Sequence, residues 1–238
     1  MGCGPILRPT DEGSVLAASN AILNEIWSTL LDQGARVTGI VLDAVEAFFS
    51  HDTDAAAKVV EADATVDHVD VEIERQCIAL LGQGVTGEYD LRSVLTIVKV
   101  NNELERIADC AVDIAEAAGT AGQVPPTVRM MANSVVGMLR DAITALSEHD
   151  TALGRRVLSF DDTVEAFKAE ILTVAQSSLT TGATEIESAV RLLSMVRAVE
   201  HIADHCTNIC EQSIYLDTGN IVRHLPSGWT DPVSPEDS

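Results

Sequence analysis

A row of acidic residues near the middle of the sequence has a spacing that could hold a metal ion. In the stretch LERIADCAVDIAE, residues 104–116, Glu105, Asp109 and Asp113 recur at every fourth position. Residues four apart lie above one another on a helix, so carboxylates placed in this way repel each other unless a cation lies among them. The spacing therefore indicates either a cation site or an acidic helix face.

A second acidic row precedes the first one in the sequence. Helices joined by a short turn pack antiparallel, so residues equidistant from the turn lie at the same height. Measured from the glycine-rich turn between the two rows, Asp63 lies opposite Asp109, and Asp67 lies opposite Glu105. An apolar residue lies opposite Asp113, which we therefore treat as a solvated neighbour. The two rows predict a site of four carboxylates.

The same arrangement is repeated later in the chain. The tripeptide His-Asp-Thr at residues 51–53 recurs at 149–151, 98 positions on, and the acidic row that begins at Glu105 recurs 95 positions on. The chain is therefore a tandem repeat, and the shorter second shift indicates a shorter loop in the second copy. The repeat predicts a second set of four carboxylates, matched across a turn near residue 182: Asp161, Glu165, Glu200 and Asp204.

Carboxylate oxygens select a particular class of metal. Four of them suit hard cations such as Mg²⁺, Mn²⁺, Ca²⁺ or oxidised iron, rather than the zinc that Cys and His ligands bind. Lys168 and Leu172 stand where the first copy has Asp70 and Glu74, so we expect the first site to bind metal more tightly. Spacing alone leaves an alternative open, in which the acidic faces are only solvated or contact a basic partner.

Composition and charge narrow the class of protein. The 238 residues include 37 acidic and 15 basic ones, for a formal charge of −22, which argues against sequence-independent nucleic-acid binding. A hydrophobic content of 46% with only 3% aromatic residues favours packed helices. Five scattered cysteines, without a secretory signal or an apolar stretch long enough to span a membrane, predict a cytoplasmic protein.

Helices must position these acidic rows. Apolar residues recur at helical spacing through most of the chain, with turn-forming residues at a few points between them. The pattern predicts an all-α fold of two tandem antiparallel three-helix bundles, with six helices at residues 14–50, 54–82, 89–118, 126–149, 151–179 and 185–216. The expected domains are a flexible N-terminus (1–13), a first repeat (14–118), a linker (119–126), a second repeat (127–216) and a C-terminal tail (217–238).

Two stretches resemble the signature of a known family. LERIADCAVDIAE and, more closely, VEHIADHCTNICEQSIYLDTGNIVRH at 199–224 are similar to the helix that ends each repeat of PhoU proteins. His201 and Cys110 depart from the residues usual in that signature. The resemblance implies two three-helix bundles that bind metal clusters through E(D)xxxD motifs. Those motifs fall on the eight acidic residues selected by spacing: Asp63, Asp67, Glu105, Asp109, Asp161, Glu165, Glu200 and Asp204.

The resemblance also implies a function. PhoU proteins couple the high-affinity phosphate ABC transporter, through its ATPase subunit, to a sensor histidine kinase, and they repress phosphate-starvation genes when phosphate is plentiful. The implied protein is a non-enzymatic homodimer that reaches the membrane only through its partners. One alternative is a regulator of a low-affinity or sodium-coupled phosphate carrier. A di-iron oxidoreductase is disfavoured, because none of the six histidines has Glu three residues before it.

Overall fold

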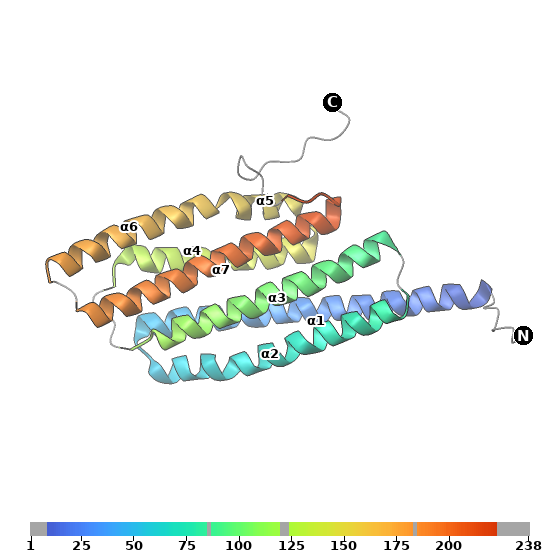
Figure 1. Ribbon diagram of the computed structural model, residues 1–238, viewed down its shortest axis with the longest axis horizontal. Coiled ribbons are helices and arrows are strands. Elements are labelled where there is room, and N and C mark those ends of the chain that lie inside the picture. The colour runs from blue at the N-terminus through green and yellow to red at the C-terminus, as the bar shows by residue number, and fades with distance from the viewer. Residues whose placement is uncertain (1–8, 85–86, 120–123, 183–184, 223–238) are drawn as a thin grey trace, which may run out of the picture.

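The computed structural model describes residues 9–84, 87–119, 124–182 and 185–222, which form helices without any strand. Figure 1 shows the helices as long, roughly parallel rods. Their bounds are α1 Pro9–Ser50, α2 Thr53–Gly82, α3 Glu88–Glu116, α4 Pro126–Glu148, α5 Thr151–Ser159, α6 Asp161–Thr180 and α7 Ile186–Thr218.

The predicted all-α plan is confirmed, and the fifth predicted helical segment is divided at Phe160 into α5 and α6. At this point the chain forms a tighter turn of the 3₁₀ type, in which the N–H of Phe160 donates to the carbonyl of Val157, three residues back, at 3.0 Å. Helix α1 begins at Pro9, a favourable first position, so residues 9–13 of the segment expected at 1–13 are helical. Residues 1–8 of that segment, 120–123 of the linker and 223–238 of the tail lie outside the described residues.

The repeated His-Asp-Thr tripeptide builds the first turn of each repeat. His51 and His149 each adopt a left-handed backbone conformation, with φ of 57° and 55°, which ends the preceding helix. The side chain of Asp52 then accepts hydrogen bonds of 3.0 and 2.9 Å from N–H groups in the first turn of α2. Asp150 accepts one of 2.9 Å from the first turn of α5. The tripeptide therefore recurs because it stops one helix and caps the next.

The two bundles lie side by side and share one hydrophobic core. Helix α3 packs against α7, and α1 against α4, while α2 and α6 form the outer flanks at opposite sides of the molecule (Figure 1). Leu104 and Ile107 of α3 and Ile202 and Ile209 of α7 are fully buried. Each such side chain contributes about 1.5–3 kcal/mol through burial. The hairpins α2–α3 and α6–α7 are the elements that carry the acidic rows.

None of these helices could cross a membrane. Within residues 9–84, 87–119, 124–182 and 185–222, no helix combines the necessary length with a sufficiently apolar composition.

Candidate metal-binding clusters

The first acidic cluster consists of Asp63 and Asp67 on α2 and of Glu105 and Asp109 on α3. Partial burial, with the nearby charges of Asp67 and Asp109, raises the pKa of Asp63 above its usual value. Burial also raises the pKa of Glu105. The negative charges of Asp109 on the same helix and of Asp67 across the hairpin raise this pKa further. Carboxylates from both helices thus lie close enough to repel one another, as the spacing predicted.

The second acidic cluster consists of Asp161 and Glu165 on α6 and of Glu200 and Asp204 on α7. Partial burial raises the pKa of Asp161, with contributions from Glu165 and Glu200. The pKa of Asp204 rises for the same reason, with contributions from Asp161 and Glu200. The second hairpin therefore assembles its four acids in the manner of the first.

Each cluster has an inner and an outer pair of carboxylates. In the first cluster, Asp63 and Glu105 are half-buried, whereas Asp67 and Asp109 are exposed to solvent. The second cluster follows the same pattern, one half-buried and one exposed acid coming from each helix. Burial disfavours the charged form of Asp63, Glu105 and Asp161, and the exposed carboxylates leave each cluster open to cations from solution.

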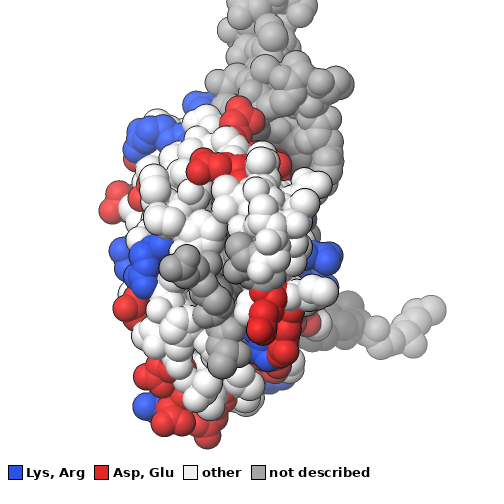
Figure 2. All heavy atoms as spheres, turned by 90° about the vertical axis from the view of Figure 1, so that its left-hand side faces the viewer, with Lys and Arg blue, Asp and Glu red and all other residues white. Residues whose placement is uncertain are grey.

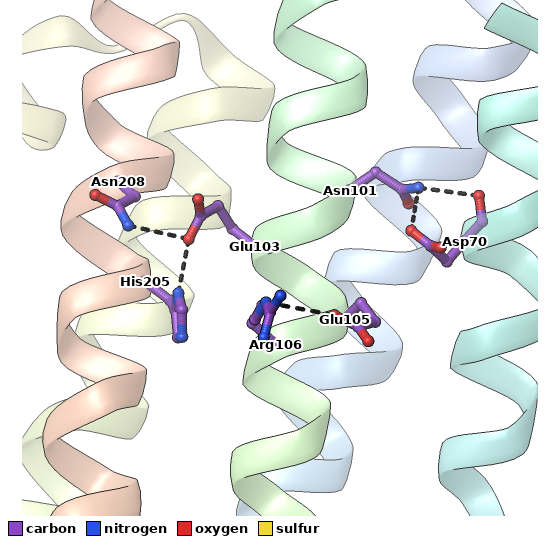
Figure 3. A network of polar contacts seen from close by, with 7 residues as sticks. All are labelled: Asp70, Asn101, Glu103, Glu105, Arg106, His205 and Asn208. Carbon is purple, nitrogen blue, oxygen red and sulfur yellow. Dashed lines mark hydrogen bonds and ion pairs between the residues drawn. The ribbon is translucent and has the colours of Figure 1, made fainter.

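The carboxylates of the first cluster are nearly free of other partners. Asp63, Asp67 and Asp109 take part in no side-chain hydrogen bond or ion pair that involves the described residues. Glu105 makes only a 3.9 Å contact with the exposed guanidinium of Arg106, drawn in Figure 3. The four negative charges are therefore poorly compensated by the protein itself.

Asp70 lies beside this cluster, but its side chain is hydrogen-bonded to Asn101 of α3. Its side chain accepts a 2.6 Å hydrogen bond from the amide of Asn101, which also donates to the Asp70 carbonyl at 3.1 Å (Figure 3). Asn101 is buried, and this pair fixes the heights of α2 and α3 relative to each other. Asp70 thus serves to join the two helices that carry the first cluster.

The second cluster contains a cation of its own. The ammonium of Lys168 donates to Glu200 at 2.5 Å and to Glu165 at 3.3 Å. The hydrogen bond to Glu200 raises the pKa of Lys168, which keeps the amine protonated. Two of the four predicted ligands are therefore already paired.

The first cluster has the right side-chain chemistry for a metal ion, but its side chains are not positioned as a metal-binding site. In the part of the chain that the structure describes, no three His, Cys, Asp or Glu side chains already converge as a metal-binding group. The four carboxylates would have to move closer together to complete one. Such a site would offer only carboxylate oxygens, which suit a hard cation.

A polar network between the repeats was not predicted from the sequence. Glu103 on α3 accepts hydrogen bonds from His205 Nδ1 at 2.7 Å and from the amide of Asn208 at 3.0 Å, both on α7. Figure 3 shows Glu103 on the side of α3 that faces α7, and Asn101 on the side that faces α2. His205 therefore joins the two bundles through this contact with Glu103.

The cysteines of the described residues belong to the core. Burial raises the pKa of Cys77 to about 11 and the pKa of both Cys110 and Cys210 to about 12. It also raises the pKa of the fully buried Cys206 well above its usual value. These thiols stay protonated at neutral pH, so they are poor nucleophiles and poor metal ligands.

The end of the molecule where α3 ends and α7 begins carries charges of both signs. Figure 2 shows basic and acidic side chains interspersed on this face. Arg129 lies 3.7 Å from Glu46, and Arg191 lies 3.0 Å from Glu187. Basic side chains that are paired in this way do not form the continuous positive surface that phosphate backbones require.

Comparisons with known proteins identify relatives of this fold and sequence. The family model described as "PhoU domain" matches residues 30–118 and again 128–213. A phosphate-specific transport system accessory protein PhoU homolog from Pseudomonas putida is 34% identical over 215 residues, covering 87% of this chain and 83% of that protein. A homolog from Clostridium acetobutylicum is 30% identical, covering 84% and 94%. The crystal structure of PhoU from Pseudomonas aeruginosa superposes with a TM-score of 0.81 at 29% identity, covering 84% of this chain and 99% of that one.

Proposed function

Because this chain belongs to the PhoU family, we propose that it is a non-enzymatic accessory regulator of phosphate transport. The observation that carries the proposal is the match of the family model to both repeats, residues 30–118 and 128–213, which together make up the two bundles. Relatives that span most of the same length are named as accessory proteins of the phosphate-specific transport system. The proposal assigns the same task to this protein.

The regulator acts by coupling two partners. We assign the ATPase subunit of a phosphate ABC transporter as one partner and a cytoplasmic sensor histidine kinase as the other. The two bundles pack against each other along α3 and α7, and we propose that this assembly contacts both proteins at once. A charge of −22 favours basic surfaces on those partners and speeds encounter with them. When phosphate is plentiful, the complex keeps the kinase from activating phosphate-starvation genes.

Metal binding to the acidic clusters would stabilise this assembly of helices. The first cluster, Asp63, Asp67, Glu105 and Asp109, is the tighter site of the two, because the protein supplies it with almost no positive charge of its own. A hard cation bound there would neutralise the repulsion that raises the pKa values of Asp63 and Glu105. The α2–α3 hairpin would then be held at one fixed spacing for partner binding.

Deleting the gene tests the proposed function. Alkaline phosphatase, a product of the phosphate-starvation response, should be expressed in high phosphate after the deletion and repressed again when the gene is restored. The matched control is deletion of a low-affinity phosphate carrier, which should leave repression intact. Full repression in the strain that lacks this protein would refute the proposed coupling, and would favour a regulator of another phosphate transporter.

A further inference from the structure

The two acidic clusters differ at one decisive position. Asp70 of α2 and Lys168 of α6 occupy equivalent places in the two repeats, 98 residues apart. In the first repeat this residue binds Asn101 of α3 at 2.6 Å and leaves the cluster without a cation. In the second repeat it reaches Glu200 of α7 at 2.5 Å, so that a positive charge lies among the acids.

Lys168 bridges the two helices of the second hairpin. Glu165, one turn before it on α6, lies 3.3 Å from its ammonium, and Glu200 lies on the facing helix α7. The Lys168 and Glu200 side chains are 28% and 18% exposed, so solvent screens this pair only in part. One ammonium group thus compensates one carboxylate from each helix of the cluster, as a bound metal ion would.

The backbone of the second cluster also differs from that of the first. Asp161 is the first residue of α6, directly after the tightened turn at Phe160, whereas its counterpart Asp63 lies well inside α2. The N–H groups at the start of a helix favour a negative charge there. Asp161 therefore has a second source of compensation that Asp63 lacks.

We propose that Lys168 is the built-in counter-ion of the second cluster, so that its ammonium group takes the place of a metal ion and only the first cluster loads metal tightly. This inference rests on the proposed function, since it takes metal binding at the first cluster as given. The repeats, although similar in fold, then play unequal parts. The α2–α3 hairpin responds to metal, and the α6–α7 hairpin keeps its structure whether or not metal is present.

Manganese binding to the full-length chain tests the inference. Electron paramagnetic resonance can count bound Mn²⁺ in the wild type, in Asp63→Asn/Asp67→Asn and in that double variant with Lys168→Met added. The wild type should bind at the first cluster, and the double variant should lose that binding. Adding Lys168→Met should then create binding at the second cluster that is at least about tenfold tighter than before. Lys58→Met, which removes an exposed lysine from α2, is the matched control and should change nothing.

Two outcomes would overturn the inference. One is a double variant that still binds Mn²⁺ as tightly as the wild type. The other, where the wild type does bind Mn²⁺, is a Lys168→Met change that fails to tighten binding at the second cluster.

A thermal measurement separates this inference from the proposed function. If neither the wild type nor any variant binds Mn²⁺, the metal-binding part of the proposed function is wrong. The role of Lys168 as a counter-ion is then tested by thermal unfolding of the metal-free protein. Lys168→Met should lower the Tm by about 2–4 °C relative to Lys58→Met, because it leaves Glu165 and Glu200 to repel one another. An unchanged Tm in Lys168→Met would show that the lysine is not a structural counter-ion.

Discussion

Replacing Glu103 with leucine should weaken the contact between the two repeats. The carboxylate accepts hydrogen bonds from His205 at 2.7 Å and from Asn208 at 3.0 Å across the α3–α7 interface. Leucine fills a similar volume but accepts no hydrogen bond, so both donors lose their partner. The His205 and Glu103 side chains are only 20% and 18% exposed, so water replaces these bonds incompletely.

The size of the effect follows from the number of bonds and their exposure. A hydrogen bond to a charged group contributes about 1.5–3 kcal/mol, and partial exposure places each of these at or below the lower end of that range. We therefore expect Glu103→Leu to lower the free energy of unfolding by about 2 kcal/mol, and the Tm by about 4–8 °C for a chain of this size. Urea denaturation followed by circular dichroism measures this change. Glu61→Leu, at an exposed position of α2, is the matched control.

A double-mutant cycle decides whether the contact itself is responsible. His205→Ala and the double variant Glu103→Leu/His205→Ala complete the cycle. The coupling free energy between the two positions should be at least about 0.5 kcal/mol, because the residues share one hydrogen bond. Effects that add to within about 0.3 kcal/mol would refute the reasoning, since each substitution would then act through packing alone.

Three further predictions concern the acidic clusters and the core. Changing Glu105 and Asp109 together to alanine should lower the metal content of the purified protein without unfolding it; unchanged metal stoichiometry by elemental analysis would contradict the metal proposal. Metal-free protein should gain stability as the pH falls from neutral towards the ordinary pKa of Asp, because folding raises the pKa of Asp63 and Asp161, so the folded state binds protons before the unfolded state does; a Tm that falls over this range would contradict it. Replacing fully buried Ile107 with alanine should cost about 2–5 kcal/mol in urea denaturation, and a loss below about 1 kcal/mol would contradict its place in the core.

The helices and their pairing could be predicted because local rules determine them. Apolar periodicity and turn-forming residues placed the helices, and a glycine-rich turn indicated which acids face each other across the first hairpin. The recurrence of His-Asp-Thr at 51–53 and 149–151 revealed the repeat, although its physical role as a helix stop and cap became clear only from the backbone. Short-range signals of this kind are visible in one sequence.

The remaining features depend on contacts that no local pattern encodes. No Gly or Pro next to Phe160 indicates the helix break there. Glu103 and His205 are 102 residues apart, and only the packing of α3 on α7 brings them together. The sequence showed that Lys168 makes the second cluster less acidic, but not that its ammonium binds Glu165 and Glu200. Such pairings follow from the choice of side-chain conformation in a packed interface.

The most direct test of the account is whether this protein binds both partners in one complex. The tagged full-length chain would be captured from cells grown in high phosphate, and the ATPase subunit of the transporter and the sensor histidine kinase would be measured in the captured material. Both partners should be recovered together, and their recovery should fall in low phosphate. Recovery of neither partner, or of one partner only at both phosphate levels, would contradict the proposed coupling.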